Sequence, residues 1–279
     1  MHGPGRTLKE LGLAVAPRAE PLAYPGAWPA ESGLLDGDRL LPPARDRRAY
    51  EGRVPVLAVG SNACPGQLRD KLDEFGIRSP VPMVRARVTG VDIGVSAHVS
   101  LMGYVSAAPF DSPGTVRELF VLWLDAEQLS VVDASEGVMR PSGAYDRVWL
   151  PGCDVRIEPE AGPSLHGAHA YVNRHGVLHD GTGAPRHHPG ERRLLAELLA
   201  GSPRLRELFG RTPEEFSARA RFDRGLCDKG TRVFAEEGMA VASGLERYVG
   251  AARTAGDVRA GRPGAGPPPA PSSARPPGR

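Results

Sequence analysis

The stretch that decides the fold prediction is Val56-Leu57-Ala58-Val59-Gly60-Ser61-Asn62, an apolar run that ends abruptly at a polar turn. The apolar run begins at Val54 and predicts a buried β-strand. A helix is expected next, because Pro65 suits a first helical turn and Gly76 suits a helix end. A turn of this kind exposes backbone N–H groups, which suit a carboxylate or a developing oxyanion. A plain strand–helix turn capped by Asn62 is the structural alternative.

A second stretch carries a candidate catalytic carboxylate: Leu129-Ser130-Val131-Val132-Asp133-Ala134-Ser135-Glu136-Gly137. Asp125 and Gln128 predict a capping box at the start of a short helix, and Gly137 is typical of a helix end. The negative end of the helix and apolar neighbours both favour the protonated form of Glu136, which suits acid–base catalysis. The alternative for Glu136 is a surface residue at a helix end. Asp133 is either a more buried partner or a surface residue.

Further apolar runs predict a β-rich core. Strands are expected over residues 82–95, 98–106, 116–124, 145–150 and 168–172. Residues 119–124 show no polar alternation, so both faces of that strand should be buried, as in a barrel or a covered sheet. From Pro189 the pattern becomes helical, with a capping box at Thr212 and a last helix over residues 231–249. The expected fold is α+β, with a small mixed β-barrel core, inserted helices and a helical C-terminal part.

Composition shifts divide the chain into four parts. Residues 1–53 are expected to form a proline-rich N-terminal arm packed on the core, because this segment contains large apolar groups such as Tyr24 and Trp28. The core domain is expected over 54–180 and a helical C-terminal extension over 181–255. Residues 256–279 hold five Gly and seven Pro with almost no large apolar side chain. They are therefore expected to be a disordered tail.

Bulk properties narrow the class of protein. The 279 residues are 41% apolar and 24% charged, which is ordinary for a globular protein. The net charge of +2 gives no electrostatic reason to expect nucleic-acid or membrane binding. No apolar run approaches the ~18 residues of a membrane span, and no apolar secretory signal is seen. Three scattered cysteines, Cys64, Cys153 and Cys227, fit small core side chains in a reducing cytoplasm, so we expect a cytoplasmic protein.

Four histidines, His166, His169, His175 and His179, raise the question of a metal site. The pair at 166 and 169 would need a third ligand from elsewhere, and the chain has neither a cysteine pair nor an H-E-x-x-H helix. Solvated loop histidines are the simpler interpretation. We therefore expect neither a metal nor a cofactor.

The two stretches, taken with Tyr145-Asp146-Arg147 after them, resemble the γ-glutamylcyclotransferase-like family. The hallmark of that family is a strand ending in Tyr-Gly-Ser-Asn, followed much later by a Leu-Asp-x-x-Glu-Gly helix and a Tyr-x-Arg strand. The resemblance covers roughly residues 54–175 and rests on the ordered combination of short motifs. It implies a β-barrel domain with a cavity where the turn and the glutamate meet.

The resemblance also implies a reaction. A γ-glutamyl small-molecule substrate would cyclise to 5-oxoproline and release an amine, with no cofactor, and Glu136 would be the catalytic acid and base. Val59, Gly60, Ser61 and Asn62 would bind substrate, and Tyr145 would line the pocket.

One departure from the family pattern keeps other functions open. The family tyrosine is replaced here by Val59, so the hydrogen bond of that phenol is lost. This favours a non-catalytic small-molecule-binding or regulatory relative as the alternative function. A hydrolase that uses water in place of the internal amine is a third possibility.

Overall fold

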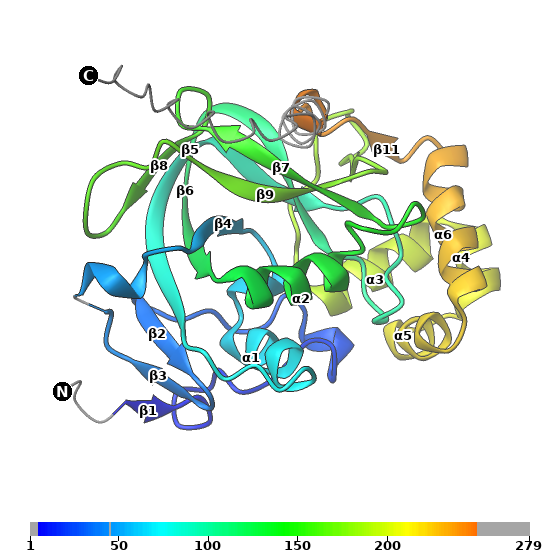
Figure 1. Ribbon diagram of the computed structural model, residues 1–279. Coiled ribbons are helices and arrows are strands. Elements are labelled where there is room, and N and C mark those ends of the chain that lie inside the picture. Colours follow the sequence, from blue (N-terminus) through cyan, green and yellow to red (C-terminus); the bar gives the residue numbers. More distant parts are fainter. Residues whose placement is uncertain (1–4, 45, 250–279) are drawn as a thin grey trace, which may run out of the picture.

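A nine-stranded mixed sheet forms the centre of the computed structural model, which describes residues 5–44 and 46–249 (Figure 1). The strand order is β1-β3-β2-β5-β6-β4-β9-β7, and β8 pairs with β5. Strands β4 and β9 run parallel, and the other pairs are antiparallel. The strands are β1 Arg6–Thr7, β2 Gly33–Asp36, β3 Arg39–Leu41, β4 Val54–Ala58, β5 Val81–Val95, β6 Ala107–Leu124, β7 Tyr145–Pro151, β8 Arg156–Pro159 and β9 Gly167–Asn173.

The α+β class is confirmed, but the closed barrel is not. The strand order has β1 at one end and β7 at the other, and these two strands do not pair within the described residues. Closing a barrel requires hydrogen bonds between the two ends of the order. The short β10 Val177–Leu178 and β11 Ala240–Val241 form a separate two-stranded sheet.

The segment that joins β5 to β6 differs from the prediction at one strand. Residues 119–124 are almost entirely buried in β6, as their continuous apolar pattern predicts. Residues 98–106, predicted as a strand, instead form a loop between β5 and β6. Its turn is at Gly103, whose φ of +87° suits glycine, and the N–H of Ser100 donates to the carbonyl of Tyr104.

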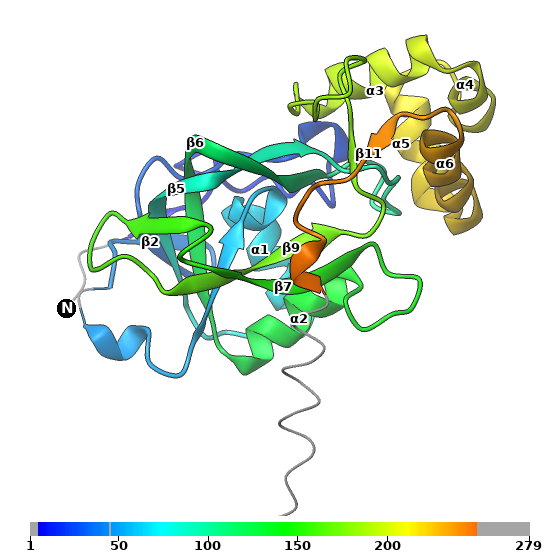
Figure 2. The same cartoon turned by 90° about the horizontal axis from the view of Figure 1, so that it is seen from above.

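Six α-helices lie wholly within the described residues, in two groups (Figures 1 and 2). Helices α1 Pro65–Asp73 and α2 Ala126–Glu136 pack beside each other. The other four gather at one end of the sheet: α3 Glu191–Gly201, α4 Pro203–Phe209, α5 Pro213–Phe222 and α6 Arg224–Glu236. Short 3-10 turns occur at Pro21–Ala23, Arg47–Ala49 and Ser61–Ala63.

The helix predicted over residues 231–249 is displaced toward the N-terminus. Helix α6 begins at Arg224, where Asp223 caps the N–H groups of Gly225 and Leu226, and it ends at Glu236. Gly238 follows with a φ of +67°, and the chain then pairs as β11. Met239, Ala240, Val241 and Leu245 therefore lie outside a helix, and Leu245 is fully buried among strand residues. Residues 247–249 are helical again.

Three large apolar clusters hold these elements together. Two lie against the sheet. The third joins the C-terminal helices to the end of β5 and to the loop over residues 98–106, and it contains the fully buried Phe209, Phe216 and Phe234. The helical part is thereby packed against the same loop that lines the cavity described below. Within residues 5–44 and 46–249, no helix combines the length and the apolar character needed to span a bilayer.

The N-terminal segment also joins the sheet. Strand β2 pairs with β5, with Gly33 opposite Met83, and Leu8 is fully buried in the main cluster. The predicted tail over residues 256–279 lies outside the described residues.

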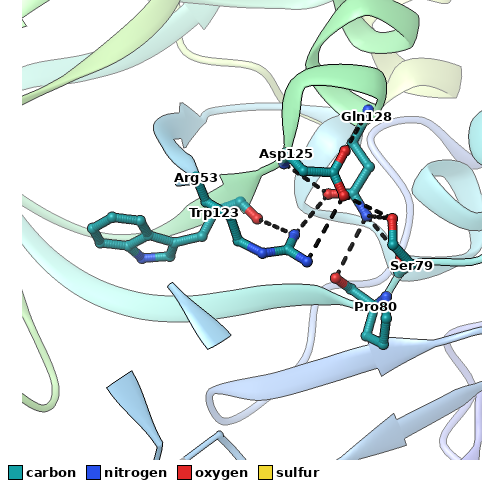
Figure 3. A network of polar contacts seen from close by, with 6 residues as sticks. All are labelled: Arg53, Ser79, Pro80, Trp123, Asp125 and Gln128. Atoms are coloured by element: carbon teal, nitrogen blue, oxygen red, sulfur yellow. Dashed lines mark hydrogen bonds and ion pairs between the residues drawn. The ribbon is translucent and has the colours of Figure 1, made fainter. Parts of the chain in front are cut away.

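The start of α2 is fixed by a buried polar network (Figure 3). The capping box predicted from Asp125 and Gln128 is confirmed, since each side chain accepts a hydrogen bond from the backbone N–H of the other residue. The Gln128 amide also donates to the carbonyl and the hydroxyl of Ser79 at 2.7 and 2.8 Å, and it accepts from Arg53 at 2.9 Å. Gln128 is fully buried, so this network sets the position of α2 against the sheet.

Gln128→Ala is therefore expected to lower the free energy of unfolding by about 2–3 kcal/mol, because it leaves several partly buried polar groups without partners. Chemical denaturation measures this change. Ser130→Ala, at an exposed position of the same helix, is the matched control and should change stability by less than about 0.5 kcal/mol. Equal stability of the two variants would contradict a structural role for the network.

Candidate functional site

A cavity of about 770 Å³ lies where the sheet, the α1–α2 pair and the C-terminal helices meet. Its walls come from the Gly60 turn, the loop over residues 98–107, the end of α2, the end of β9 and one face of α6. All six residues singled out from the sequence as site residues line it: Val59, Gly60, Ser61, Asn62, Glu136 and Tyr145. The structure thus brings together two stretches that are far apart in sequence.

The Gly60 turn places backbone donors at the cavity wall. Strand β4 ends at Ala58, and the 3-10 turn Ser61–Ala63 leads into α1. Within the described residues, the backbone N–H groups of Ser61 and Asn62 donate to no protein acceptor. The N–H of Ala63 already donates to the carbonyl of Gly60 at 3.0 Å. Two backbone donors therefore remain available to a bound anion or carbonyl oxygen.

Glu136 reaches the cavity because α2 ends beside it. Gly137 adopts the left-handed conformation with a φ of +75°, as expected for a helix end, and the N–H of Val138 donates to the carbonyl of Asp133. The Glu136 side chain is 17% exposed. The helix end therefore directs a largely buried carboxylate toward the opposite turn.

A lysine that the sequence analysis missed changes the expected environment of Glu136. Lys71 Nζ lies 3.0 Å from Glu136 Oε1 and 2.7 Å from Asn62 Oδ1, and the Asn62 amide donates to the same Glu136 oxygen at 3.1 Å. The three side chains form a closed triangle. The expectation of apolar surroundings for Glu136 is thus wrong, because an ammonium group and an amide face it.

The position of Lys71 in the sequence indicates that its side chain needs an acidic partner. It lies between Leu68 and Leu72 on the face of α1 that is buried, and its own side chain is 7% exposed. A lysine on an apolar helix face usually requires a partner of opposite charge. No sequence spacing identifies which of the many acidic residues is that partner.

Within the described residues, every hydrogen bond made to the Glu136 carboxylate falls on Oε1. One oxygen is therefore held by two donors, and Oε2 remains available to a ligand. This asymmetry suits a carboxylate that must be fixed in position and still exchange a proton.

Four tyrosines, Tyr24, Tyr104, Tyr145 and Tyr171, surround the carboxylate in the cavity wall. Burial raises the pKa of each phenol, to about 12 for Tyr145 and well above the ordinary value for Tyr24. All four phenols are therefore protonated at neutral pH, so each has an O–H that can donate a hydrogen bond. The motifs in the sequence indicate Tyr145 as a pocket residue, but they do not indicate the other three tyrosines, which come from separate segments.

Asp133 is engaged in a separate cluster. Its carboxylate accepts from the Tyr171 hydroxyl at 2.8 Å and pairs with Arg147 at 3.1 Å. Burial raises the pKa of Asp133, and the Tyr171 hydrogen bond and the Arg147 charge oppose this shift. Of the two roles left open for Asp133, the structure favours a partly buried partner that orders the cavity wall, since it orients Tyr171.

Arg174 positions the loop between α2 and β7. Its guanidinium donates to the carbonyls of Val138, Arg140, Pro141 and Gly143 and to the carboxylate of Asp146. Several residues of this loop line the cavity mouth. One half-buried arginine thus holds the loop that follows Glu136, a role that no motif in the sequence indicates.

His98 lies at the cavity wall in its neutral form. Its Nδ1 accepts from the Asn173 amide at 3.0 Å, so the ring proton belongs on Nε2. Burial lowers the pKa of His98 to about 3.

The lowered pKa of His98 predicts that the folded protein loses stability in acid. Between about pH 6.5 and pH 3 the unfolded chain binds a proton at His98 and the folded protein does not, so stability falls as the pH falls. We expect this group to lower the free energy of unfolding by about 2 kcal/mol between pH 7 and pH 5. Urea unfolding at both pH values measures the change. His98→Gln should flatten it, and an unchanged difference in that variant would contradict the assignment.

Of the histidines and cysteines considered from the sequence, two line the cavity and the others do not. Within the described residues, no group of three or more His, Cys, Asp or Glu side chains could hold a metal ion. His175 lines the cavity, as does Cys227, which is buried in the helical cluster. Cys64 is buried, whereas Cys153 is exposed, so the expectation of a core position is wrong for Cys153.

Comparisons with known proteins find no matching family model and no matching curated protein. Solved structures do match. A γ-glutamyl cyclotransferase is 14% identical over 64% of this chain and 99% of its own, with a TM-score of 0.34. An Arabidopsis thaliana protein is 20% identical over 44% of this chain and 70% of its own, and an uncharacterised Homo sapiens protein is 20% identical over 44% and 67%, each with a TM-score of 0.32.

Proposed function

We propose that this protein is an enzyme of the γ-glutamylcyclotransferase type, which cyclises a γ-glutamyl group to 5-oxoproline and releases an amine. The observation that carries the proposal is the position of Glu136, whose carboxylate lies 3.1 Å from the Asn62 side chain in a large cavity. The ordered motifs of the sequence and the available backbone donors of the Gly60 turn also support it.

The proposed reaction needs one proton shuttle and one oxygen-binding site. Glu136 takes a proton from the α-ammonium of the substrate, and the freed amine attacks the γ-carbonyl carbon. The γ-carbonyl oxygen becomes negatively charged and is stabilised by the N–H groups of the Gly60 turn. Glu136 then gives its proton to the leaving nitrogen as the amide bond breaks. It also passes the remaining extra proton of the new ring nitrogen to the released amine, which departs as an ammonium ion. Nucleophile and electrophile belong to one molecule, so holding the folded conformer supplies much of the rate.

The role of Lys71 in this proposal is to hold the Glu136 carboxylate in place. Its ammonium lies 3.0 Å from Oε1, on the side held by Asn62. The substrate ammonium would approach Oε2.

The alternative is a binding or regulatory protein of the same fold. The replacement of the family tyrosine by Val59 favours it, because the strand supplies no hydroxyl to the site. Such a protein would bind a γ-glutamyl compound in the same cavity and release it unchanged.

Product analysis separates these functions. The purified protein is incubated with γ-glutamylalanine, and the products are identified by mass spectrometry. Equimolar 5-oxoproline and alanine are expected. Glutamate in place of 5-oxoproline would indicate a hydrolase that uses water. Binding without any product would favour the non-catalytic alternative and reject the proposed reaction.

A further inference from the structure

The N-terminal segment contributes a buried phenol to the cavity. Tyr24 follows the 3-10 turn Pro21–Ala23, is 4% exposed and stacks on Tyr104 with the ring centroids 4.4 Å apart. Its hydroxyl lies directly against Gly60, where a Cβ atom built on the glycine would be 2.5 Å from the Tyr24 oxygen. Glycine at this position thus allows a side chain from a distant segment to contact the turn.

The Tyr24 hydroxyl is oriented by one partner and has a proton left to donate. The backbone N–H of Ala107 donates to the Tyr24 oxygen at 2.7 Å. In the part of the chain that the structure describes, no acceptor receives the Tyr24 O–H. By contrast, Tyr171 donates to Asp133, and Tyr145 donates to the Ala107 carbonyl. A buried hydroxyl with an unused donor is unfavourable, unless a ligand supplies the acceptor.

We propose that Tyr24 is a substrate-contacting residue, whose O–H donates to an oxygen of the γ-glutamyl group bound at the Gly60 turn. This inference rests on the proposed function. The Tyr24 hydroxyl lies against Gly60, and Tyr24, Ser61 and Asn62 all line the cavity. The raised pKa of the buried phenol keeps its proton in place throughout the reaction.

The Tyr24 hydroxyl could donate to either of two substrate oxygens, the γ-carbonyl oxygen or an α-carboxylate oxygen. Steady-state kinetics distinguishes the two. If Tyr24 donates to the γ-carbonyl oxygen, the bond strengthens as charge develops, so its loss lowers kcat. If it donates to the α-carboxylate, the bond is present equally in the bound substrate and the transition state, so its loss raises KM.

Tyr24→Phe tests the proposal, because it removes the hydroxyl and keeps the stacked ring. With γ-glutamylalanine we expect kcat/KM for 5-oxoproline release to fall about 10²-fold. Tyr50→Phe is the matched control: it also removes a bonded hydroxyl, which donates to Ala44 at 3.2 Å, and Tyr50 does not line the cavity. Its kcat/KM should stay within about twofold of the wild type. Thermal unfolding of both variants confirms that each is folded at the assay temperature.

Unchanged kcat/KM in Tyr24→Phe would overturn the proposal while leaving the proposed function standing. If the wild type releases no 5-oxoproline, the kinetic assay cannot be used. Isothermal titration calorimetry then measures the binding of γ-glutamylalanine to the wild type and to Tyr24→Phe. Weaker binding by the variant then supports the contact, although the proposed reaction is rejected. Equal binding, or no binding by the wild type, overturns the contact as well.

Discussion

Glu136→Gln is expected to lower the rate of 5-oxoproline release by about 10²–10⁴-fold, the range that a positioned proton shuttle contributes. Glutamine keeps the shape of the side chain, and its carbonyl oxygen can still accept from Lys71 and Asn62. It has no basic oxygen at the position of Oε2. The loss should therefore appear in kcat, with the fold retained. Steady-state kinetics with γ-glutamylalanine measures it.

Glu74→Gln is the matched control for this substitution. Glu74 also lines the cavity, but its side chain is 53% exposed and pairs with Arg18 at the surface. Its neutralisation should change the rate by less than about fivefold, since an exposed ion pair is worth ~0–1 kcal/mol. Equal turnover by Glu136→Gln and the wild type would remove Glu136 from its proposed role.

Lys71→Met is expected to lower the free energy of unfolding by about 2–4 kcal/mol and to reduce 5-oxoproline release. The substitution leaves the Glu136 carboxylate, which is 17% exposed, without its ion-pair partner. It also leaves the Asn62 carbonyl oxygen without its donor. Urea unfolding measures the first effect and steady-state kinetics the second. Lys229→Met, at an exposed position of α6, is the control and should stay within about 0.5 kcal/mol of the wild type.

A double-mutant cycle shows whether the loss arises from the pair. In the Lys71→Met/Glu136→Gln variant no carboxylate is left unpaired, so the double variant should be less destabilised than the sum of the two single variants. Additive losses would mean that Lys71 stabilises the fold through its packing alone, and that the ion pair contributes little.

The local elements near the site were readable from the sequence because each depends on neighbouring residues. The strand before Gly60, the capping box of Asp125 and Gln128, and the helix end at Gly137 are confirmed. The loop over residues 98–106 was misread as a strand, since its apolar residues are buried by contacts with the C-terminal helices. Apolar content reports burial, and it does not by itself distinguish a strand from a buried loop.

The surroundings of Glu136 were not readable from the sequence. Lys71, Tyr24 and Tyr104 lie in three separate segments, and no periodicity connects them to the carboxylate. Val59 supplies no hydroxyl, and the phenol that contacts Gly60 comes from Tyr24 instead. Such contacts form only when the sheet, the N-terminal segment and the α1–α2 pair are packed together.

The sequence by itself determined the strand, the turn and the helix end that carry Gly60, Asn62 and Glu136, because backbone conformation and capping act between near neighbours. The tertiary structure decided that the Glu136 carboxylate faces Lys71, and that the Tyr24 phenol lies against the turn. The physical reason is that a charge or a hydroxyl in a buried cavity takes its properties from groups within a few ångströms, wherever these stand in the chain.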